Sequence, residues 1–181
     1  LDSLMFQKKG KSRCINQENP RGEKGKGGMA AGSLGPGRKG SPCMEEIAPG
    51  ETRVLAEMEG PGVIQHIWMT VTDRTEKDYY VLRDLVLRIY WDDEEEPSVE
   101  SPLGDFFCCG FARGCMVNSL PIVVNPSRGF NSYFQMPFRK KARITLENQH
   151  EAEIPAFFYQ VDYTLYDEIP EDVAYFHAQW R

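Results

Sequence analysis

The stretch Gly60-Pro61-Gly62-Val63-Ile64-Gln65-His66-Ile67-Trp68-Met69-Thr70-Val71-Thr72 decides the fold of this 181-residue chain. Its Gly-Pro-Gly opening signals a turn, and a β-branched and aromatic run follows. One face of a strand would carry Val63, Ile67, Met69 and Val71, and the other Ile64, His66, Trp68 and Thr70. Because both faces carry bulky side chains, we expect a central strand, or one that is covered on both sides.

Similar runs recur along the chain at roughly even spacing, separated by Gly and Pro turns. We expect further strands at residues 54–58, 85–92, 121–124, 133–137, 142–147 and 157–166. No β-α alternation accompanies them, so the sequence predicts an all-β jelly-roll sandwich and no parallel sheet. The only helix we expect is short and C-terminal, over residues 171–180, where Pro170 and two acidic residues give a start signal.

The formal net charge is −6, but it is unevenly distributed. Residues 1–43 hold nine Lys and Arg against three acidic residues, and residues 10–50 hold ten of the 16 glycines. We therefore divide the chain into a Gly-rich basic arm, residues 1–50, and a jelly-roll domain, residues 51–181. A basic arm can bind nucleic acid, but Phe6 is its one aromatic residue for stacking, so we expect no nucleic-acid partner. We expect the arm to pack on the acidic surface of its own body or of a neighbouring subunit.

Cellular location is predicted from apolar content and cysteine usage. No stretch approaches the roughly 20 apolar residues that span a bilayer, and residues 1–11 turn polar and basic too early for a signal peptide. The five cysteines are odd in number and include no C-x-x-C pair, which disfavours a zinc site or a disulfide framework. We expect reduced, mostly buried thiols, a cytoplasmic location and no membrane partner.

Common catalytic motifs are missing from the sequence. It contains no G-x-S-x-G elbow, H-E-x-x-H pair, P-loop or dinucleotide fingerprint. His66, His150 and His177 lack metal-ligand spacing. The acidic run at residues 92–96 is typical of a solvated turn, because consecutive carboxylates do not converge on one ion without a tight glycine loop. We therefore expect neither a metal site nor a cofactor.

One segment contains more polar and aromatic groups than a purely structural loop needs. It is Glu100-Ser101-Pro102-Leu103-Gly104-Asp105-Phe106-Phe107, inside a loop expected over residues 98–111. It places two carboxylates beside paired aromatic rings, and binding residues commonly lie in such loops. Ring faces beside hydrogen-bonding acids suit a sugar. The alternative is that Phe106 and Phe107 plug the end of the sandwich while Asp105 caps a turn.

A second such segment is the opening strand itself, where Trp68 and His66 share one face. An indole and an imidazole together could line a pocket. Trp68 would fit equally well in the core.

Five segments together resemble one bacterial family of glycoside hydrolases, formerly a domain of unknown function, that acts on difructose dianhydride and on D-arabinofuranosides. They are GPGVIQHIW (residues 60–68), LRIYWD (87–92), PSVESPLGDFF (97–107), NSYFQMPF (131–138) and ARITLEN (142–148). The segments occur in the family's order, and the similarity extends over roughly residues 11–181.

The resemblance implies two tandem jelly rolls per subunit, trimers or hexamers, and a pocket near a subunit boundary. It also implies a retaining mechanism with two glutamates, whose carboxyl groups such enzymes hold about 5–5.5 Å apart. In the family these glutamates lie in motifs of the type W-G-E-G-E and G-T-E-D in the second jelly roll, and neither motif occurs here. We therefore expect an N-terminal half without catalytic residues of its own and inactive alone. Its expected partners are a furanoside carbohydrate and either further copies in a homo-oligomer or a second jelly-roll half.

The arm departs from the family pattern, in which a stretch resembling S-S-Y-D followed by G-G-N contributes to the pocket. Here residues 12–20 are SRCINQENP, and only the arginine is retained in place. The residues expected to bind sugar are Asp105, Glu100, Trp68 and His66 from the body, with Arg13, Glu18 and Asn19 from the arm. The alternative function is a non-catalytic carbohydrate-binding or assembly jelly roll, because this fold serves lectins and shells as readily as enzymes.

Overall fold

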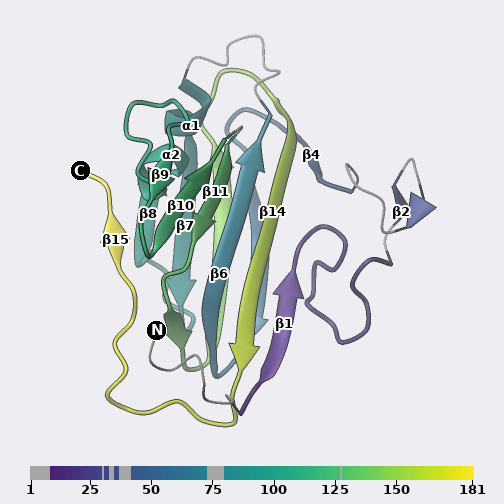
Figure 1. The fold of residues 1–181 in the computed structure, drawn as a ribbon, viewed down its shortest axis with the longest axis vertical. Helices are drawn as coiled ribbons and strands as arrows, with labels where there is room; N and C mark the ends of the chain where they lie inside the picture. Colours follow the sequence, from purple (N-terminus) through teal and green to yellow (C-terminus); the bar gives the residue numbers. More distant parts are fainter. Residues whose placement is uncertain (1–8, 30, 33–34, 37–41, 73–79, 127) are drawn as a thin grey trace.

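The computed structural model of the protein describes residues 9–29, 31–32, 35–36, 42–72, 80–126 and 128–181. These residues form a sandwich of two β-sheets, which Figure 1 shows stacked one in front of the other. The first sheet runs in the order β1 (Lys11–Ile15), β14 (Ile154–Leu165), β6 (Gly62–Val71), β11 (Gly129–Ser132), β10 (Ile122–Asn125) and β9 (Val117–Asn118). In addition, β12 (Met136–Phe138) pairs with β6, and β4 (Met44–Ile47) pairs with β14. The second sheet runs β15 (Ala178–Gln179), β8 (Val99–Pro102), β7 (Leu85–Trp91), β13 (Lys141–Asn148) and β5 (Thr52–Glu59). The predicted β-sandwich is thus confirmed.

Most of the expected strands are present with small shifts at their ends, namely those now seen as β5, β6, β7, β10, β13 and β14. The strand expected over residues 133–137 is wrong in its limits. The chain forms β11 before it and β12 within its last part, and both pair with β6. Residues 133–135, between these two strands, do not belong to a strand.

β6 is the central strand of the first sheet, with β14 on one side and β11 and β12 on the other. The expectation that Ile64 shares a face with His66 is wrong, because Ile64 is fully buried in the core. A bulge explains the difference: β14 pairs Asp162 with His66 but Tyr163 with Ile64, so Gln65 is an extra residue that turns Ile64 inward.

The core lies between the sheets and is built from alternate residues of the long strands. Phe157, Tyr159, Val161 and Tyr163 come from β14, Leu87, Ile89 and Trp91 from β7, and Ala142, Ile144 and Leu146 from β13. The alternation expected for residues 142–147 and 157–166 is therefore confirmed. It fixes which side chains face outward from each sheet.

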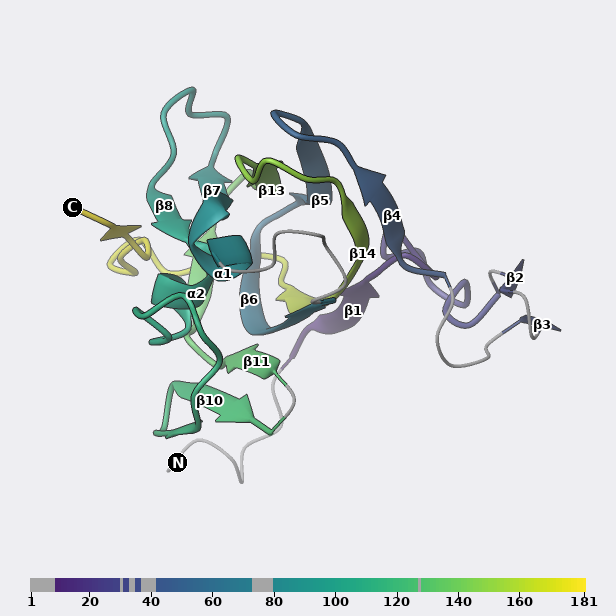
Figure 2. The ribbon, with the colours of Figure 1, turned by 90° about the horizontal axis from the view of Figure 1, so that it is seen from above.

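One end of the sandwich is closed by two short helices, α1 (Val81–Asp84) and α2 (Leu103–Phe106), which lie side by side in Figure 2. Phe107 follows α2 and is fully buried, with its ring stacked on Phe130 at a centroid distance of 5.4 Å. The expected loop over residues 98–111 is thus wrong, because its first part is strand β8 and its middle is α2. A four-residue strand that ends in Pro102 gives too short an alternation to identify from sequence.

The arm contributes strands to the first sheet. β1 pairs with one end of β14 and β4 with the other, and Ile15 and Ile47 are fully buried. These two strands therefore attach the arm to its own body, while β2 (Ala31–Gly32) and β3 (Gly35–Pro36) form a small hairpin away from the sandwich (Figures 1 and 2). Phe6, the arm's aromatic residue, lies outside the described residues. The division at residue 50 stays a prediction.

The expected C-terminal helix is wrong. Residues 171–180 run as an extended segment into β15, which pairs parallel with β8. The Tyr175 hydroxyl donates to the Asp92 carboxylate, and Trp91 Nε1 donates to the Phe176 carbonyl at 2.8 Å. These tertiary contacts outweigh a weak local start signal. In the part of the chain that the structure describes, no helix is long and apolar enough to cross a membrane.

Candidate functional site

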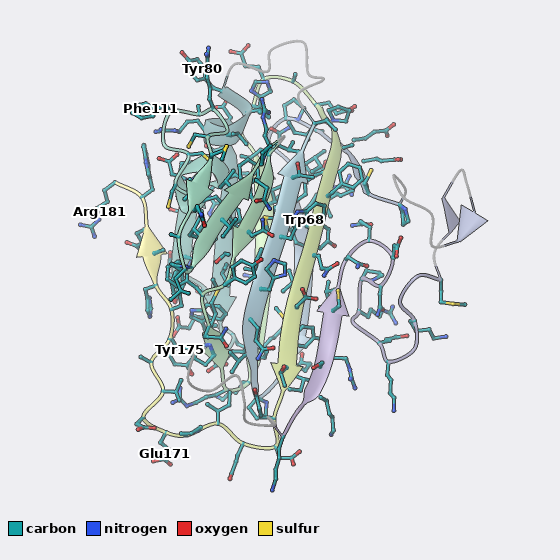
Figure 3. All side chains as sticks on the ribbon, viewed as in Figure 1. Trp68, Tyr80, Phe111, Glu171, Tyr175 and Arg181 are labelled. Atoms are coloured by element: carbon teal, nitrogen blue, oxygen red, sulfur yellow. The ribbon has the colours of Figure 1, made fainter. Side chains whose placement is uncertain are left out.

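The outer surface of the first sheet carries a polar and aromatic cluster. We define the His66 face as His66 and Trp68 of β6, Asn131 of β11, Tyr133, and Gln160 and Asp162 of β14. Strand register brings them together, because β14 pairs Asp162 with His66 and Gln160 with Trp68, while β11 pairs Asn131 with Trp68. Trp68 is labelled in Figure 3, in front of this sheet and outside the core. Two residues expected to bind sugar, His66 and Trp68, therefore do share one face.

His66 is held by hydrogen bonds at both ring nitrogens. Nδ1 lies 2.8 Å from Asp162 Oδ2, and Nε2 lies 3.2 Å from Asn131 Oδ1. The Asn131 amide nitrogen donates to the carbonyls of Val123 at 3.1 Å and Gly129 at 3.0 Å. Asn131 must therefore turn its oxygen toward His66 and accept from Nε2. Because both partners of the imidazole are acceptors, the network favours the doubly protonated imidazolium.

Electrostatics in the cluster agree with the hydrogen bonds. The hydrogen bond to Asp162 raises the pKa of His66 above its ordinary value, and burial opposes this less strongly. Burial alone would raise the pKa of Asp162, but hydrogen bonds from His66, Gln160 and Cys14 outweigh burial and lower it. The Tyr133 ring stacks on His66 at a centroid distance of 4.8 Å. The cluster is thus a hydrogen-bonded His66–Asp162 pair, which is an ion pair when His66 is protonated, with the Tyr133 ring stacked on the imidazole.

Replacing Asp162 with Asn should lower the pKa of His66, because the carboxylate that stabilises the imidazolium is lost. The raised His66 pKa stabilises the fold fully below pH 6.5, and this contribution is lost as the pH rises through the folded-state pKa. The lowered Asp162 pKa stabilises the fold above pH 3.8, and this contribution is lost as the pH falls through its folded-state pKa. Titrating the imidazole NMR signals of both proteins measures the His66 shift.

The matched control is Asp84→Asn, because Asp84 Oδ2 lies 2.8 Å from Nδ1 of another histidine, His150. This variant should change the His150 signals and leave the His66 pKa where it is. A His66 pKa that is the same in Asp162→Asn and in the wild type would contradict the imidazolium assignment.

The arm reaches the edge of the His66 face through Cys14, which β1 pairs with Asp162. Burial raises the pKa of Cys14 to about 12, assisted by the negative charges of Asp162 and, more weakly, Glu18. Glu18 lines a separate hollow of the arm together with Asn19, and its contact with the sugar stays a prediction. Asn19 is committed to the arm's own turn, since its side chain donates to the Glu23 carbonyl at 3.0 Å and accepts from the Glu23 amide at 3.1 Å.

Arg13 does not join the His66 face. It is two residues from the fully buried Ile15 on the same strand, so the alternation of β1 places both on the side opposite Cys14. β1 pairs Arg13 with Tyr163, and its guanidinium donates to the Ser12 carbonyl at 2.9 Å.

Glu100 lies in a different place, on the outer surface of the second sheet. A groove of about 330 Å³ there is lined by Arg83, Asp84, Val86, Arg88, Glu100, Ser101, Pro102, Gln149 and Trp180. We call it the Trp180 groove. Arg88, one of the lining residues, bridges two carboxylates, with Nε 2.5 Å from Glu100 Oε2 and Nη1 2.6 Å from Glu147 Oε2. The groove depends on β15, because the half-exposed Trp180 directly follows this strand and its backbone amide donates to the Glu100 carbonyl of β8 at 3.0 Å.

Asp105 anchors one wall of this groove. Its Oδ2 lies 3.2 Å from Arg83 Nε, and the Arg83 guanidinium also lies 5.2 Å from the centre of the Trp180 ring. Phe107 belongs to the core and Phe106 packs against it. The alternative in which Phe106 and Phe107 plug the end of the sandwich therefore describes the two aromatic rings. The Asp105 carboxylate, by contrast, forms an ion pair.

The two catalytic carboxylates of a retaining glycosidase must lie close together, one to attack the sugar and the other to exchange a proton with it. Here three of the candidate carboxylates are held by basic side chains from separate places: Glu100 by Arg88, Asp105 by Arg83, and Asp162 by His66. The His66 face and the Trp180 groove lie on the outer faces of opposite sheets. A single chain therefore does not gather the expected sugar-binding residues into one pocket.

Several residues of these two surfaces were not among the expected ones: Asp162, Asn131, Tyr133, Gln160, Arg88 and Trp180. Asp162 had a signal, since it is an acid that alternates with buried residues on a long strand. Asn131 and Tyr133 lie in a segment that carries the family resemblance. No sequence signal identified Trp180, because its position depends on the parallel pairing of β15.

No group of His, Cys, Asp and Glu side chains arranged to hold a metal ion occurs among the described residues. A family model described as GH172 first beta-sandwich domain matches residues 13–180 of the chain. No curated protein matches the chain.

Proposed function

Because the chain belongs to the GH172 family, we propose that it supports the sugar site of a glycoside hydrolase that cleaves fructofuranosyl or arabinofuranosyl linkages by a retaining mechanism. In this proposal the first β-sandwich holds and orients the sugar, and the catalytic carboxylates come from a second sandwich. Positioning alone can contribute a large share of a rate enhancement.

One observation carries this division of labour. Three of the carboxylates considered above, Glu100, Asp105 and Asp162, are each held by a basic side chain. A carboxylate that is fixed in an ion pair can accept hydrogen bonds from sugar hydroxyls. It is poorly suited to act as nucleophile or as general acid, because the basic side chain occupies oxygen atoms that would have to reach the substrate.

The His66 face is the better candidate for contact with the sugar. Trp68 and the exposed Tyr133 present aromatic surface, and Gln160 and Asp162 add polar atoms beside it. Sugars bind such surfaces through their C–H faces and hydroxyls.

The test is an activity assay on the 181-residue chain with an aryl α-D-arabinofuranoside and with difructose dianhydride. We expect no turnover by the chain alone and turnover when a polypeptide carrying a second GH172 sandwich is added. Turnover by the chain alone that Asp105→Asn or Glu100→Gln abolishes would contradict the proposal, since this half would then supply its own catalytic carboxylates.

A pair of tryptophan variants tests which surface is used. Trp68→Ala should lower the restored activity by about tenfold or more, because a stacked aromatic side chain is lost at the sugar. Trp180→Ala is the matched control in the Trp180 groove and should change it by less than about twofold. The reverse result would move the sugar to the groove.

The alternative is a non-catalytic carbohydrate-binding or assembly module. Assembly is supported by three exposed apolar side chains in one stretch, Phe111, Met116 and Leu120, of which Phe111 is labelled at the upper edge of the molecule in Figure 3. Sugar binding without turnover, even with the second sandwich present, would favour this alternative. In either case we propose a trimer or hexamer, and a stable monomer in sedimentation at micromolar concentration would contradict that assembly.

A further inference from the structure

Three of the five cysteines gather in the segment after α2. Cys109 is almost completely buried at 1% exposure, whereas Cys108 and Cys115 are exposed, and all three are free thiols. The sulfur of Cys115 lies 3.6 Å from the sulfur of Cys109. It also lies 3.9 Å from the Cys108 carbonyl, and the Cys109 sulfur lies 3.8 Å from the Cys115 carbonyl. The loop of residues 109–115 thus returns on itself and places two sulfur atoms in contact.

We propose that Cys109 and Cys115 form a thiol oxidation site, at which a small-molecule disulfide converts the two thiols into an intramolecular disulfide. The sulfurs must approach by about 1.5 Å more to reach the S–S bond length of 2.05 Å. Cys115 can supply this movement because its side chain is exposed. Cys108 precedes Cys109 directly and its side chain is directed away from the core, so it is the less favourable partner.

The chemistry proceeds in two thiol–disulfide exchanges. The Cys115 thiolate attacks one sulfur of oxidised glutathione, the S–S bond breaks, and one glutathione leaves as a thiolate that takes up a proton. The Cys109 sulfur, after losing its own proton, then attacks Cys115, and a second glutathione leaves. Each chain therefore loses two thiol hydrogens and releases two reduced glutathiones.

Burial assigns the order of the two steps. It raises the pKa of Cys109 to about 11, so little thiolate forms there at neutral pH. The exposed Cys115 meets the oxidant first, and the buried thiol resolves the mixed disulfide. This pairing of an accessible thiol with a second thiol in contact with it is what a lone surface cysteine lacks.

The disulfide would enclose the residue that fixes Arg83. Within the loop, the Gly110 carbonyl accepts from Arg83 Nη2 at 2.5 Å, and Arg83 continues to Asp105 and the Trp180 ring. Oxidation is therefore linked through Arg83 to a wall of the Trp180 groove. The proposal does not depend on the sugar-site function above.

The chain offers a direct test because Arg113 lies between the two cysteines. Trypsin cleaves after Arg88, Arg113 and Arg128, so it separates Cys109 and Cys115 into peptides 89–113 and 114–128. After treatment of the folded protein with oxidised glutathione, alkylation and denaturation, we expect these two peptides to remain joined until a reductant is added. The same reaction should release two glutathiones per chain.

Variants identify the partners. Cys115→Ser, at an exposed position, should abolish the joined peptides, and Cys109→Ser should do the same. Cys108→Ser and Cys43→Ser should retain the cross-link. Loss of the joined peptides in Cys108→Ser, or a stable glutathione adduct on Cys115 with no cross-link in the wild-type chain, would overturn the proposal.

Discussion

Phe107→Ala is expected to destabilise the protein by about 3–5 kcal/mol, the usual cost of truncating a fully buried phenylalanine. The Phe107 ring is fully buried, stacks on Phe130 of the first sheet at 5.4 Å and meets Phe106 edge-to-face at 5.0 Å. It therefore joins the segment after α2 to the opposite sheet. A domain of this size loses about 2–4 °C of Tm per kcal/mol, so the Tm should fall on the order of 10 °C.

The matched control for this substitution is Phe111→Ala, four residues further along the same segment. Phe111 is 94% exposed, so its removal should change the free energy of unfolding by no more than about 0.5 kcal/mol. Urea denaturation of the two variants measures the difference. Equal midpoints would contradict the role assigned to Phe107 as the plug of the sandwich end.

The long strands were predictable because their burial is periodic. In β14, the buried residues Phe157, Tyr159, Val161 and Tyr163 alternate with more exposed ones, and the same period appears in the sequence. β6 shows where this argument fails. The bulge at Gln65 breaks the period of two, and a sequence contains no local sign of which residue the partner strand will skip.

The prediction of a C-terminal helix over residues 171–180 failed for a different reason. Pro170 and two acids are a real start signal for a helix, but the signal is worth little compared with tertiary contacts. Tyr175 and Phe176 instead bind the turn after β7 and the Trp91 indole. Because those partners are more than 80 residues away along the chain, no local pattern could reveal them.

The candidate site was predictable in its parts and not in its arrangement. His66 and Trp68 were identified from one strand, and they do share a face. Asp162 completes that face only through strand pairing across 96 residues. Glu100 and Asp105 were grouped with His66 through the family resemblance, but the sandwich places Glu100 and the Arg83 partner of Asp105 on the other sheet's surface. Sequence gives the residue types, and strand pairing decides which of them meet.

Among the acidic residues discussed here, Asp92 is the one whose replacement should reduce the stability of the fold most. It directly follows β7 and has a positive φ of 52°. Its Oδ1 accepts hydrogen bonds from the backbone amides of Arg139 at 3.0 Å, Lys140 at 2.6 Å and Lys141 at 3.0 Å. Its other oxygen accepts from the Tyr175 hydroxyl. Burial alone would raise the pKa of Asp92, but these hydrogen bonds outweigh burial and lower it. One carboxylate thus holds the turn before β13 and the C-terminal segment together.

Asp92→Ala should therefore destabilise the protein by about 2–4 kcal/mol at neutral pH, because several charge-assisted hydrogen bonds are lost together. The neighbouring Asp93 is the matched control: its φ is also positive, at 67°, but its carboxylate is 67% exposed and lies 4.0 Å from Lys141 Nζ. Asp93→Ala includes the same backbone cost of placing alanine in the left-handed region, roughly 1 kcal/mol, without the hydrogen bonds.

The lowered pKa of Asp92 stabilises the fold above pH 3.8, and this stabilisation is lost as the pH falls through the folded-state pKa. The gap in unfolding free energy between wild type and Asp92→Ala should accordingly narrow in acid, and a gap of constant size across that range would mean that the charge of Asp92 does not contribute.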